Sequence, residues 1–247
     1  LDDANEVIER LLPKVGVRAP RSLAGAFATM LKYQLLLAVR GTGFRLRQES
    51  SISTADLRRI DVLRSIGEPL ALSSLMHGNA LNWQATWHAL RAGEPRRIVL
   101  GLTALATMTS LRGTRSAKRV NALVAQADQL TPSFDDAQAR GRVALAQGLS
   151  LKISGRWKRG VEQLEQANQI FAGLPGARWE IQTAQISLYD ALYWMGEWAR
   201  LAREVPARRQ DAEQRGDLYS ATHVIARLSP LVHLAHDRVA DARADAE

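Results

Sequence analysis

Apolar residues recur along most of the chain at spacings of three and four, which is the period of one face of an α-helix. In residues 23–38, for example, Leu23, Phe27, Met30 or Leu31, Gln34 and Leu37–Ala38 follow this spacing, with Gln34 as the one polar member. The alternation of Val, Ile, Thr and aromatic residues that is typical of strands is almost absent. The pattern therefore predicts an all-α chain. Turn and capping residues divide it into helices over about 2–12, 20–40, 54–66, 70–92, 95–112, 116–130, 134–153, 157–171, 179–195, 198–215, 217–235 and 238–247.

Prolines, glycines and hydroxyl residues set the expected ends of the early helices. Pro20 suits the first turn of a helix, and Arg40-Gly41-Thr42-Gly43 suits the end of that helix. Residues 51–54 offer hydroxyl groups that can cap the next helix. Gly67-Glu68-Pro69 predicts a break, and Glu94-Pro95 predicts a new start.

The longest apolar stretch is 23–39, and Lys32 interrupts it. A membrane-spanning helix needs about 20 mostly apolar residues without such a charge. Asp2, Asp3 and Glu6 argue against a signal peptide at the start of the sequence. We therefore expect this stretch to be a core helix of a soluble protein, and we expect no membrane partner.

Three turns in the second half of the chain recur at a fixed interval. Gly155 and Gly196 are 41 residues apart, and Asp237 lies another 41 residues on. Each is expected between two helices, so a helix–turn–helix unit of about 40 residues repeats. Such a unit is the signature of an α-solenoid, in which antiparallel helix pairs stack on one another. The predicted fold class is therefore an all-α solenoid of antiparallel helix pairs.

The first of these units matches the tetratricopeptide pattern, in which small residues let two helices cross closely. The matching residues are Gly148, Leu151, Gly155, Trp157, Gly160, Leu164 and Ala167. In the second unit Tyr189 and Leu201 replace small residues, and the loop over 173–177 lengthens the connection. The repeat is therefore tetratricopeptide-like but divergent. We expect such repeats over 94–247 and an irregular helical section, continuous with them, over 1–92.

Composition narrows the class of protein. The chain has 247 residues, of which 46% are hydrophobic and 23% charged, and these values exclude a disordered tail. The sequence has no cysteine, which excludes disulfide scaffolds, thiolate zinc sites and cysteine nucleophiles and fits a cytoplasmic protein. The sequence begins at Leu1 rather than Met and ends within a helical pattern, so we expect a fragment of a longer protein.

Positive charge is concentrated in the middle of the chain. The net charge is +8, and residues 91–160 hold thirteen Lys and Arg against four Asp and Glu. Such an excess attracts nucleic acid, anionic lipid or an acidic protein surface, and a solvated helix face is the alternative interpretation. The candidate partner-binding basic patch consists of Arg96, Arg97, Arg112, Arg115, Lys118, Arg119, Arg156, Lys158 and Arg159.

Seven short motifs occur in order between residues 11 and 219. They are Arg40-Gly41…Phe44-Arg45-Leu46-Arg47, Leu57-Arg58-Arg59-Ile60-Asp61-Val62, Ala89-Leu90-Arg91-Ala92-Gly93-Glu94-Pro95, Gly155-Arg156-Trp157, Trp179-Glu180, Leu192-Tyr193…Gly196-Glu197 and Ala212-Glu213-Gln214-Arg215-Gly216-Asp217-Leu218-Tyr219. Together they resemble the helical-repeat region that follows the ATPase module in large bacterial serine/threonine kinase–ATPase regulators. These regulators are related to the signal-transduction ATPases with numerous domains. Residues 75–87 depart from the pattern of that family.

In that family the kinase and nucleotide-binding modules precede the repeats. Neither a Gly-x-x-x-x-Gly-Lys-Ser/Thr loop nor a His-Arg-Asp catalytic loop occurs in this sequence, so no catalytic residue carries over. The resemblance implies a non-catalytic regulatory or sensor scaffold whose parent chain is a serine/threonine kinase or an ATPase. The expected partner is a protein segment or the parent chain's own kinase or ATPase modules. The alternative is a basic α-solenoid that binds nucleic acid.

No residues form an evident catalytic, cofactor or metal site, so we expect no enzyme and no cofactor within these residues. His233 and His236 are three positions apart on an expected helix, but no third ligand is evident, and we interpret them as surface histidines. Gly41-Thr42-Gly43 follows a helix, whereas a phosphate loop follows a strand, so we interpret it as a helix end.

Two tryptophan pairs stand at helical spacing, namely Trp83 with Trp87 and Trp194 with Trp198. We interpret them as packing between helices, and an aromatic wall on a peptide-binding groove is the alternative. Serine, histidine and aspartate are all present, but a catalytic triad depends on spatial geometry that no sequence motif supports in this chain.

Overall fold

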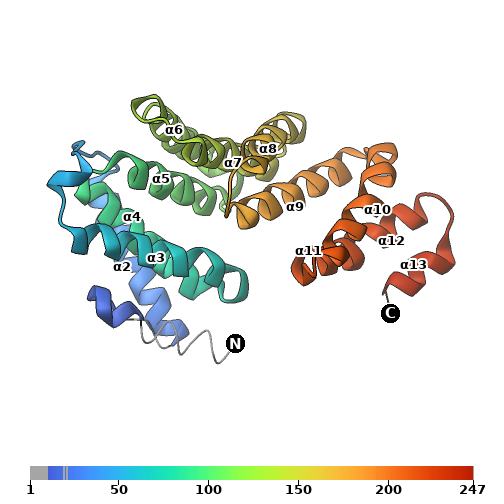
Figure 1. Cartoon of the computed structure of the whole chain (residues 1–247), viewed down its shortest axis with the longest axis horizontal. Helices are drawn as coiled ribbons and strands as arrows, with labels where there is room; N and C mark the ends of the chain where they lie inside the picture. The colour runs from blue at the N-terminus through green and yellow to red at the C-terminus, as the bar shows by residue number, and fades with distance from the viewer. Residues whose placement is uncertain (1–10, 19, 21, 247) are drawn as a thin grey trace. The chain divides into compact units, whose positions relative to one another are not determined.

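The computed structural model describes residues 11–18, 20 and 22–246, and every regular element in these ranges is helical. This confirms the all-α prediction for the part of the chain that is described. The chain divides into two compact units, unit 1 over Leu1–Ala146 and unit 2 over Gln147–Glu247 (Figure 1). No described helix is both long enough and apolar enough to cross a bilayer.

Unit 1 is built from antiparallel helices that follow one another along the chain. Its α-helices are α2 (Leu23–Arg40), α3 (Thr54–Ser73), α4 (Leu75–Ala92), α5 (Pro95–Ser110) and α6 (Ala117–Asp128), and α7 (Ala137–Ile153) begins in it. Short 3₁₀ turns lie between them at η1 (Leu12–Val15), η2 (Glu49–Ser51), η3 (Gly113–Ser116) and η4 (Thr131–Ser133). Helix α4 packs against α2, α3 and α5, and α5 packs against α6. The main core therefore lies around α4, α5 and α6.

Local capping explains where the helices of unit 1 begin. The Ser53 hydroxyl accepts a hydrogen bond from the Asp56 amide, and the Glu94 carboxylate accepts from the Arg96 and Arg97 amides. Both starts confirm the prediction. The prediction for Pro20 is wrong, because α2 begins at Leu23 with Ser22 as its cap. The helix expected over 2–12 lies almost wholly outside the described residues.

The predicted break at Gly67-Glu68-Pro69 is wrong, because α3 continues through these residues to Ser73. Pro69 and Ser65, the residue four positions before it, are both exposed, so water can satisfy the carbonyl that the proline leaves unbonded. Gly67 serves close helix packing instead, since a Cβ at this position would lie 2.7 Å from Asn82 Oδ1. The chain reverses at Ser74, between α3 and α4.

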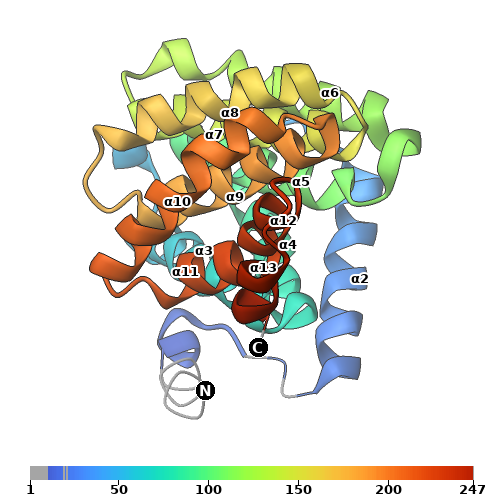
Figure 2. The ribbon, with the colours of Figure 1, turned by 90° about the vertical axis from the view of Figure 1, so that its right-hand side faces the viewer.

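The expectation that residues 23–39 form a core helix holds only in part, because Tyr33 and Leu37 belong to the main core but much of the helix is exposed. Helix α2 buries only Ala26, Tyr33 and Leu37. Figure 2 shows α2 at the edge of unit 1, with α4 on one side of it. The long apolar stretch is therefore half core and half surface.

Unit 2 is built from helices that pack against their neighbours along the chain. After the end of α7 it contains α8 (Trp157–Ala172), α9 (Arg178–Met195), α10 (Trp198–Gln214), α11 (Leu218–His223), the π-helix η5 (Val224–Leu228), α12 (Ser229–Leu234) and α13 (Val239–Ala246). The helix expected over 217–235 is present over 218–234, and it contains a π turn that the sequence did not predict. Pro230 lies directly after this turn and has no amide hydrogen to donate, which favours such a local widening.

Three turns of unit 2 have the same backbone geometry. Gly155, Gly196 and Asp237 adopt left-handed φ values of 76°, 72° and 56°. At each turn the left-handed residue donates to the carbonyl three residues back, and the next residue donates to the carbonyl five residues back. These bonds are Gly155 to Lys152, Arg156 to Leu151, Gly196 to Tyr193, Glu197 to Leu192, Asp237 to Leu234 and Arg238 to His233. All three predicted turn positions are therefore confirmed, each as a Schellman turn.

The close crossing expected between the first two helices of unit 2 is present. A Cβ on Gly148 of α7 would lie 2.7 Å from Leu164 Cγ of α8. A Cβ on Gly160 of α8 would lie 3.1 Å from the Lys152 nitrogen and 3.2 Å from the Gly148 carbonyl oxygen. Both positions therefore need glycine, because larger side chains would force the helices apart.

Asp237→Gly should stabilise the protein by about 0.5–1 kcal/mol, because Asp237 is the one non-glycine residue with positive φ in the described part of the chain. Urea denaturation of the full chain measures the change. Asp241→Gly, in the first turn of α13, is the control and should lose stability, since glycine is a poor helix former. A loss of stability in Asp237→Gly would show that its carboxylate matters more than its backbone strain.

Candidate interaction site in unit 1

Arg96 and Arg97 of the predicted basic patch bind carboxylates inside unit 1. Arg97 forms a bidentate pair with Asp61 at 2.9 and 2.7 Å and further bonds to Glu49 at 3.0 Å and Glu94 at 3.1 Å. Its side chain is only 12% exposed. Burial alone would lower the pKa of Arg97, but the hydrogen bonds to Asp61 and Glu49 outweigh it and raise this pKa. Arg97 therefore ties the start of α5 to α3 and η2.

Arg96 is held in a similar way. Its guanidinium donates to Asp136 at 2.5 Å and to Gln138 at 2.6 Å. Both residues of this pair of arginines thus have partners before any other molecule binds. They are also far from the other members of the patch in unit 1, because α5 is about 24 Å long at 1.5 Å per residue.

The other four residues of the patch that lie in unit 1 surround the connection between α5 and α6. Arg112, Arg115, Lys118 and Arg119 are all exposed, and no described residue forms an ion pair with them. Residues 95–127 contain no Asp or Glu, and the first turn of α6 has no acidic residue. The positive end of the α6 dipole adds to this charge. An anionic partner at this connection would therefore meet no competing carboxylate on α5 or on α6 before its last residue, Asp128.

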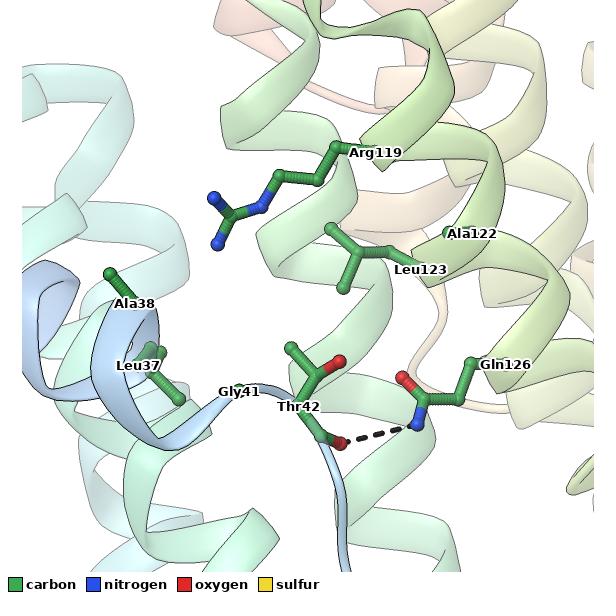
Figure 3. A pocket seen from close by; sticks show the side chains of 8 residues that line it. All are labelled: Leu37, Ala38, Gly41, Thr42, Arg119, Ala122, Leu123 and Gln126. Carbon is green, nitrogen blue, oxygen red and sulfur yellow. Dashed lines mark hydrogen bonds between the residues drawn. The ribbon is translucent and has the colours of Figure 1, made fainter.

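A cleft of about 300 Å³ lies beside this cluster, between the end of α2 and one face of α6. It is lined by Leu37, Ala38, Gly41, Thr42, Arg119, Ala122, Leu123 and Gln126 (Figure 3). Leu37 and Leu123 are almost fully buried and form an apolar floor. The Arg119 side chain extends into the open space toward α2, as Figure 3 shows.

The wall of the cleft opposite Arg119 is fixed by backbone interactions. Helix α2 ends at Arg40, and Gly41 has a φ of 75° and donates its amide hydrogen to the Leu37 carbonyl. The Gln126 side-chain amide donates to the Thr42 carbonyl at 3.2 Å and so links the two walls. Gly41-Thr42-Gly43 is thus a helix end, as predicted. A guanidinium above an apolar floor can bind a ligand that has both an anionic group, such as a carboxylate or phosphate, and an apolar group.

The last three residues of the patch, Arg156, Lys158 and Arg159, lie in unit 2 at the start of α8, and all three are exposed. The structure therefore divides the nine predicted residues into three groups, one at each end of α5 and one in unit 2. The four at the α5–α6 connection are next to a cleft.

An aromatic cluster accompanies the group in unit 2. Trp157 stacks on Trp194, with ring centroids 6.4 Å apart and an interplanar angle of 16°, and Tyr193 meets both Trp194 and Trp198 edge to face. Trp194 is nevertheless 57% exposed. The interpretation of Trp194 and Trp198 as packing therefore holds only in part.

The other tryptophan pair is different. Trp83 is buried in the core of unit 1, whereas the half-buried Trp87 carries the guanidinium groups of Arg40 and Arg91 at 5.7 and 5.9 Å from its ring. Trp87 thus already has two cations of the same unit beside its ring.

Ser229, His233 and Asp245 lie together in unit 2, but not as a triad. The Ser229 hydroxyl and the Asp245 carboxylate both face the same ring nitrogen of His233, Nε2, at 3.4 and 3.1 Å. A triad needs its serine and aspartate on different ring nitrogens. His236 faces the Val232 carbonyl at 2.9 Å rather than His233. No group of three potential metal ligands gathers anywhere in the described residues.

Sequence reasoning missed the exposed side of α2 that borders the cleft. Two signals in the sequence mark it. Residues 11–48 contain no Asp or Glu, and apolar residues recur at every fourth position from Leu23 to Val39. A stripe with this spacing winds around the helix, so one flat core contact cannot cover all of it.

Comparison of the chain with protein-family models, with curated proteins and with solved structures gives no match.

Proposed function

We propose that this chain is a non-catalytic protein-interaction scaffold that binds an acidic segment of a partner at the cleft between α2 and α6. The observation that carries the proposal is the set of four exposed cations without ion-pair partners among the described residues, next to an apolar floor. A solvated helix face needs charge but no adjoining cleft. An acidic protein segment supplies carboxylates for the cations and an apolar side chain for Leu37 and Leu123.

The repeat pattern supports a regulatory role of the kind found in α-solenoids. The three Schellman turns at intervals of 41 residues and the close crossing at Gly148 and Gly160 fit a divergent tetratricopeptide-like solenoid. The sequence resemblance adds the expectation of a cytoplasmic sensor region in a bacterial kinase–ATPase regulator. On this proposal the partner is a separate protein or the parent chain's own modules, and binding biases the parent between off and on states.

Arg115→Glu, Lys118→Glu and Arg119→Glu combined should weaken binding of an acidic peptide about tenfold or more. The probe is a fluorescent Glu- and Asp-rich peptide with one leucine and a central proline that prevents helix formation. Anisotropy titrations measure the affinity. The variant should remain folded, because the three residues are exposed and glutamates favour the first turn of α6.

The matched control makes the same change of charge in unit 2, at Arg156, Lys158 and Arg159. It should leave the affinity for the peptide within about twofold of the wild-type value, since none of these three residues lines the cleft and exposed charges are screened by salt. Equal losses of affinity in the two variants would show that the peptide responds to net charge alone, and this result would overturn the proposed site.

A second candidate, binding of single-stranded nucleic acid, is favoured by the stacked Trp157 and Trp194 beside three exposed cations. Aromatic rings and cations together form a stacking platform for bases. A fluorescent oligonucleotide titrated at two salt concentrations separates the candidates. Binding near physiological salt that falls steeply with added salt and is lost in Trp194→Ala would favour nucleic acid and overturn the first proposal.

A further inference from the structure

The exposed residues on the outer face of helix α2 are all apolar, and the half-buried Gln34 lies among them. The exposed members are Leu23, Ala24, Phe27, Ala28, Leu31, Leu35, Ala38 and Val39. At 100° per residue these eight positions fall within an arc of about 160°. The buried residues of α2 lie on the opposite arc, against α4. The outer face is therefore a continuous surface about as long as the helix.

This outer face is too large to be an ordinary feature of a surface. The five large side chains are between 42% and 91% exposed. With about 150–200 Å² for each complete side chain, they offer on the order of 500 Å² of apolar area. Patches of this size on a single protein commonly mark an interface. A partner helix that covered it would bury a similar area of its own, which gives a total near the about 1,000 Å² of a specific interface.

The charges around the outer face indicate the chemistry of what covers it. Lys32 stands at its edge, Arg40 is at the end of α2, and no Asp or Glu occurs from residue 11 to residue 48. Ala38 belongs both to the outer face and to the lining of the cleft, and Arg119 lies across the cleft from it (Figure 3). The cations of the α5–α6 connection therefore continue the positive rim past the end of α2. An occupant with acidic edges would be attracted along the whole length.

A second copy of the chain does not fit this arrangement. The midpoint of α2 falls between Leu31 and Lys32. Antiparallel pairing of two α2 helices about a two-fold axis would therefore place the two Lys32 side chains at the same height on the same side. No carboxylate of either α2 could compensate them, so like charges would oppose the pairing.

We propose that the outer face of α2 binds an amphipathic helix of another protein, with leucine-like residues on one side and Asp or Glu along both edges. This inference rests on the proposed function, because it extends the same acidic partner from the cleft onto α2. The partner helix would bind as amphipathic helices bind in apolar grooves, through apolar side chains spaced three and four residues apart. The acidic edge nearer to α6 would contact Arg119.

The test uses the whole chain and three synthetic peptides of the same length as α2. The first has leucines on one helical face and glutamates along both edges. The second has lysines in place of the glutamates, and the third has the first composition in scrambled order. We expect the first peptide to bind and to become helical, which anisotropy and circular dichroism measure, and we expect the other two to bind at least about tenfold more weakly, which corresponds to about 1.4 kcal/mol.

Phe27→Gln, Leu31→Gln and Leu35→Gln combined should weaken binding of the first peptide about tenfold or more. The variant should fold, because all three side chains point to solvent. The control variant combines Leu218→Gln and Leu234→Gln, two exposed leucines in unit 2, and should bind the peptide with unchanged affinity. Equal binding of the glutamate and lysine peptides, or unchanged affinity in the α2 variant, would overturn the inference.

Two further outcomes are distinguishable. Sedimentation that shows a dimer of the wild-type chain, lost in the α2 variant, would assign the outer face to a second copy and overturn the acidic helix. If the proline-containing acidic peptide depends on Arg115, Lys118 and Arg119 while no helical peptide depends on α2, the inference about α2 fails and the proposed function stands. If neither peptide binds, both fail.

Discussion

Gly93→Ala should destabilise unit 1 by about 3 kcal/mol, as the sum of backbone strain and overpacking. Gly93 ends α4 with a φ of 87°, which L-residues rarely adopt. A Cβ at this position would fall on the Arg45 carbonyl oxygen, far inside van der Waals contact, and 3.2 Å from Arg47 Cγ. The opposing gain from a stiffer unfolded chain is only about 0.4–1 kcal/mol.

Two other glycines of unit 1 allow the effect of backbone strain to be separated from the effect of overpacking. Gly113 also has a positive φ, 74°, but a Cβ there meets nothing within 4 Å, so Gly113→Ala should cost only about 1 kcal/mol. Gly43 has neither a positive φ nor a neighbour within 4 Å, and Gly43→Ala should be nearly neutral. Urea denaturation compares the three variants. Equal losses for Gly93→Ala and Gly113→Ala would contradict the role of the contact with Arg45.

The contact of Gly93 also concerns the candidate site. The Arg47 amide donates to the Gly93 carbonyl at 2.9 Å, which anchors the segment that leaves α2. This segment begins with Gly41 and Thr42, which line the cleft. A side chain at position 93 would push it away, so Gly93→Ala should also weaken binding of the acidic peptide. The fold thus positions the cleft through a backbone contact that only glycine permits.

The features that the sequence predicted well depend on residues close together in the chain. Ser53 caps α3 through the amide of Asp56, and Glu94 caps α5 through the amides of the next residues. The turns at Gly155 and Gly196 close through carbonyls three and five residues back. A pattern within a few positions is enough to specify each of these, because all partners lie within it.

The features that the sequence did not predict depend on partners far along the chain. Arg97 binds Asp61 and Glu49, which are 36 and 48 positions away, so the composition of the patch did not reveal that this cation is already neutralised. Pro69 suggested a break because its burial was unknown, yet it lies on the exposed side of α3. The exposed residues on the outer face of α2 are apolar, so in the sequence they look the same as residues of a core. Only the position of α4 decides which half is buried.

Acidification from about pH 6.5 to pH 4 should cost unit 1 up to about 3 kcal/mol through His88. Burial, with smaller contributions from the nearby Arg59 and Arg91, lowers the pKa of His88 from 6.5 to about 4, and Asp56 opposes these effects. Its ring also packs against Tyr33, with centroids 6.3 Å apart. In this range the unfolded chain binds a proton at His88 that the folded chain does not, so stability falls as the pH falls. The loss is complete near pH 4.

His88→Gln should remove this dependence, because glutamine fills a similar volume and does not titrate. Urea denaturation at pH 7.0, 5.5 and 4.5 measures how steeply the free energy of unfolding changes with pH in the wild-type protein and in the variant. Burial also lowers the pKa of His223 in unit 2, which contributes with the same sign, so His223→Gln is the matched variant. The slope should fall in each single variant and most in the double variant, since the two histidines lie in different units. An unchanged slope in His88→Gln would mean that solvent reaches its ring in the folded state.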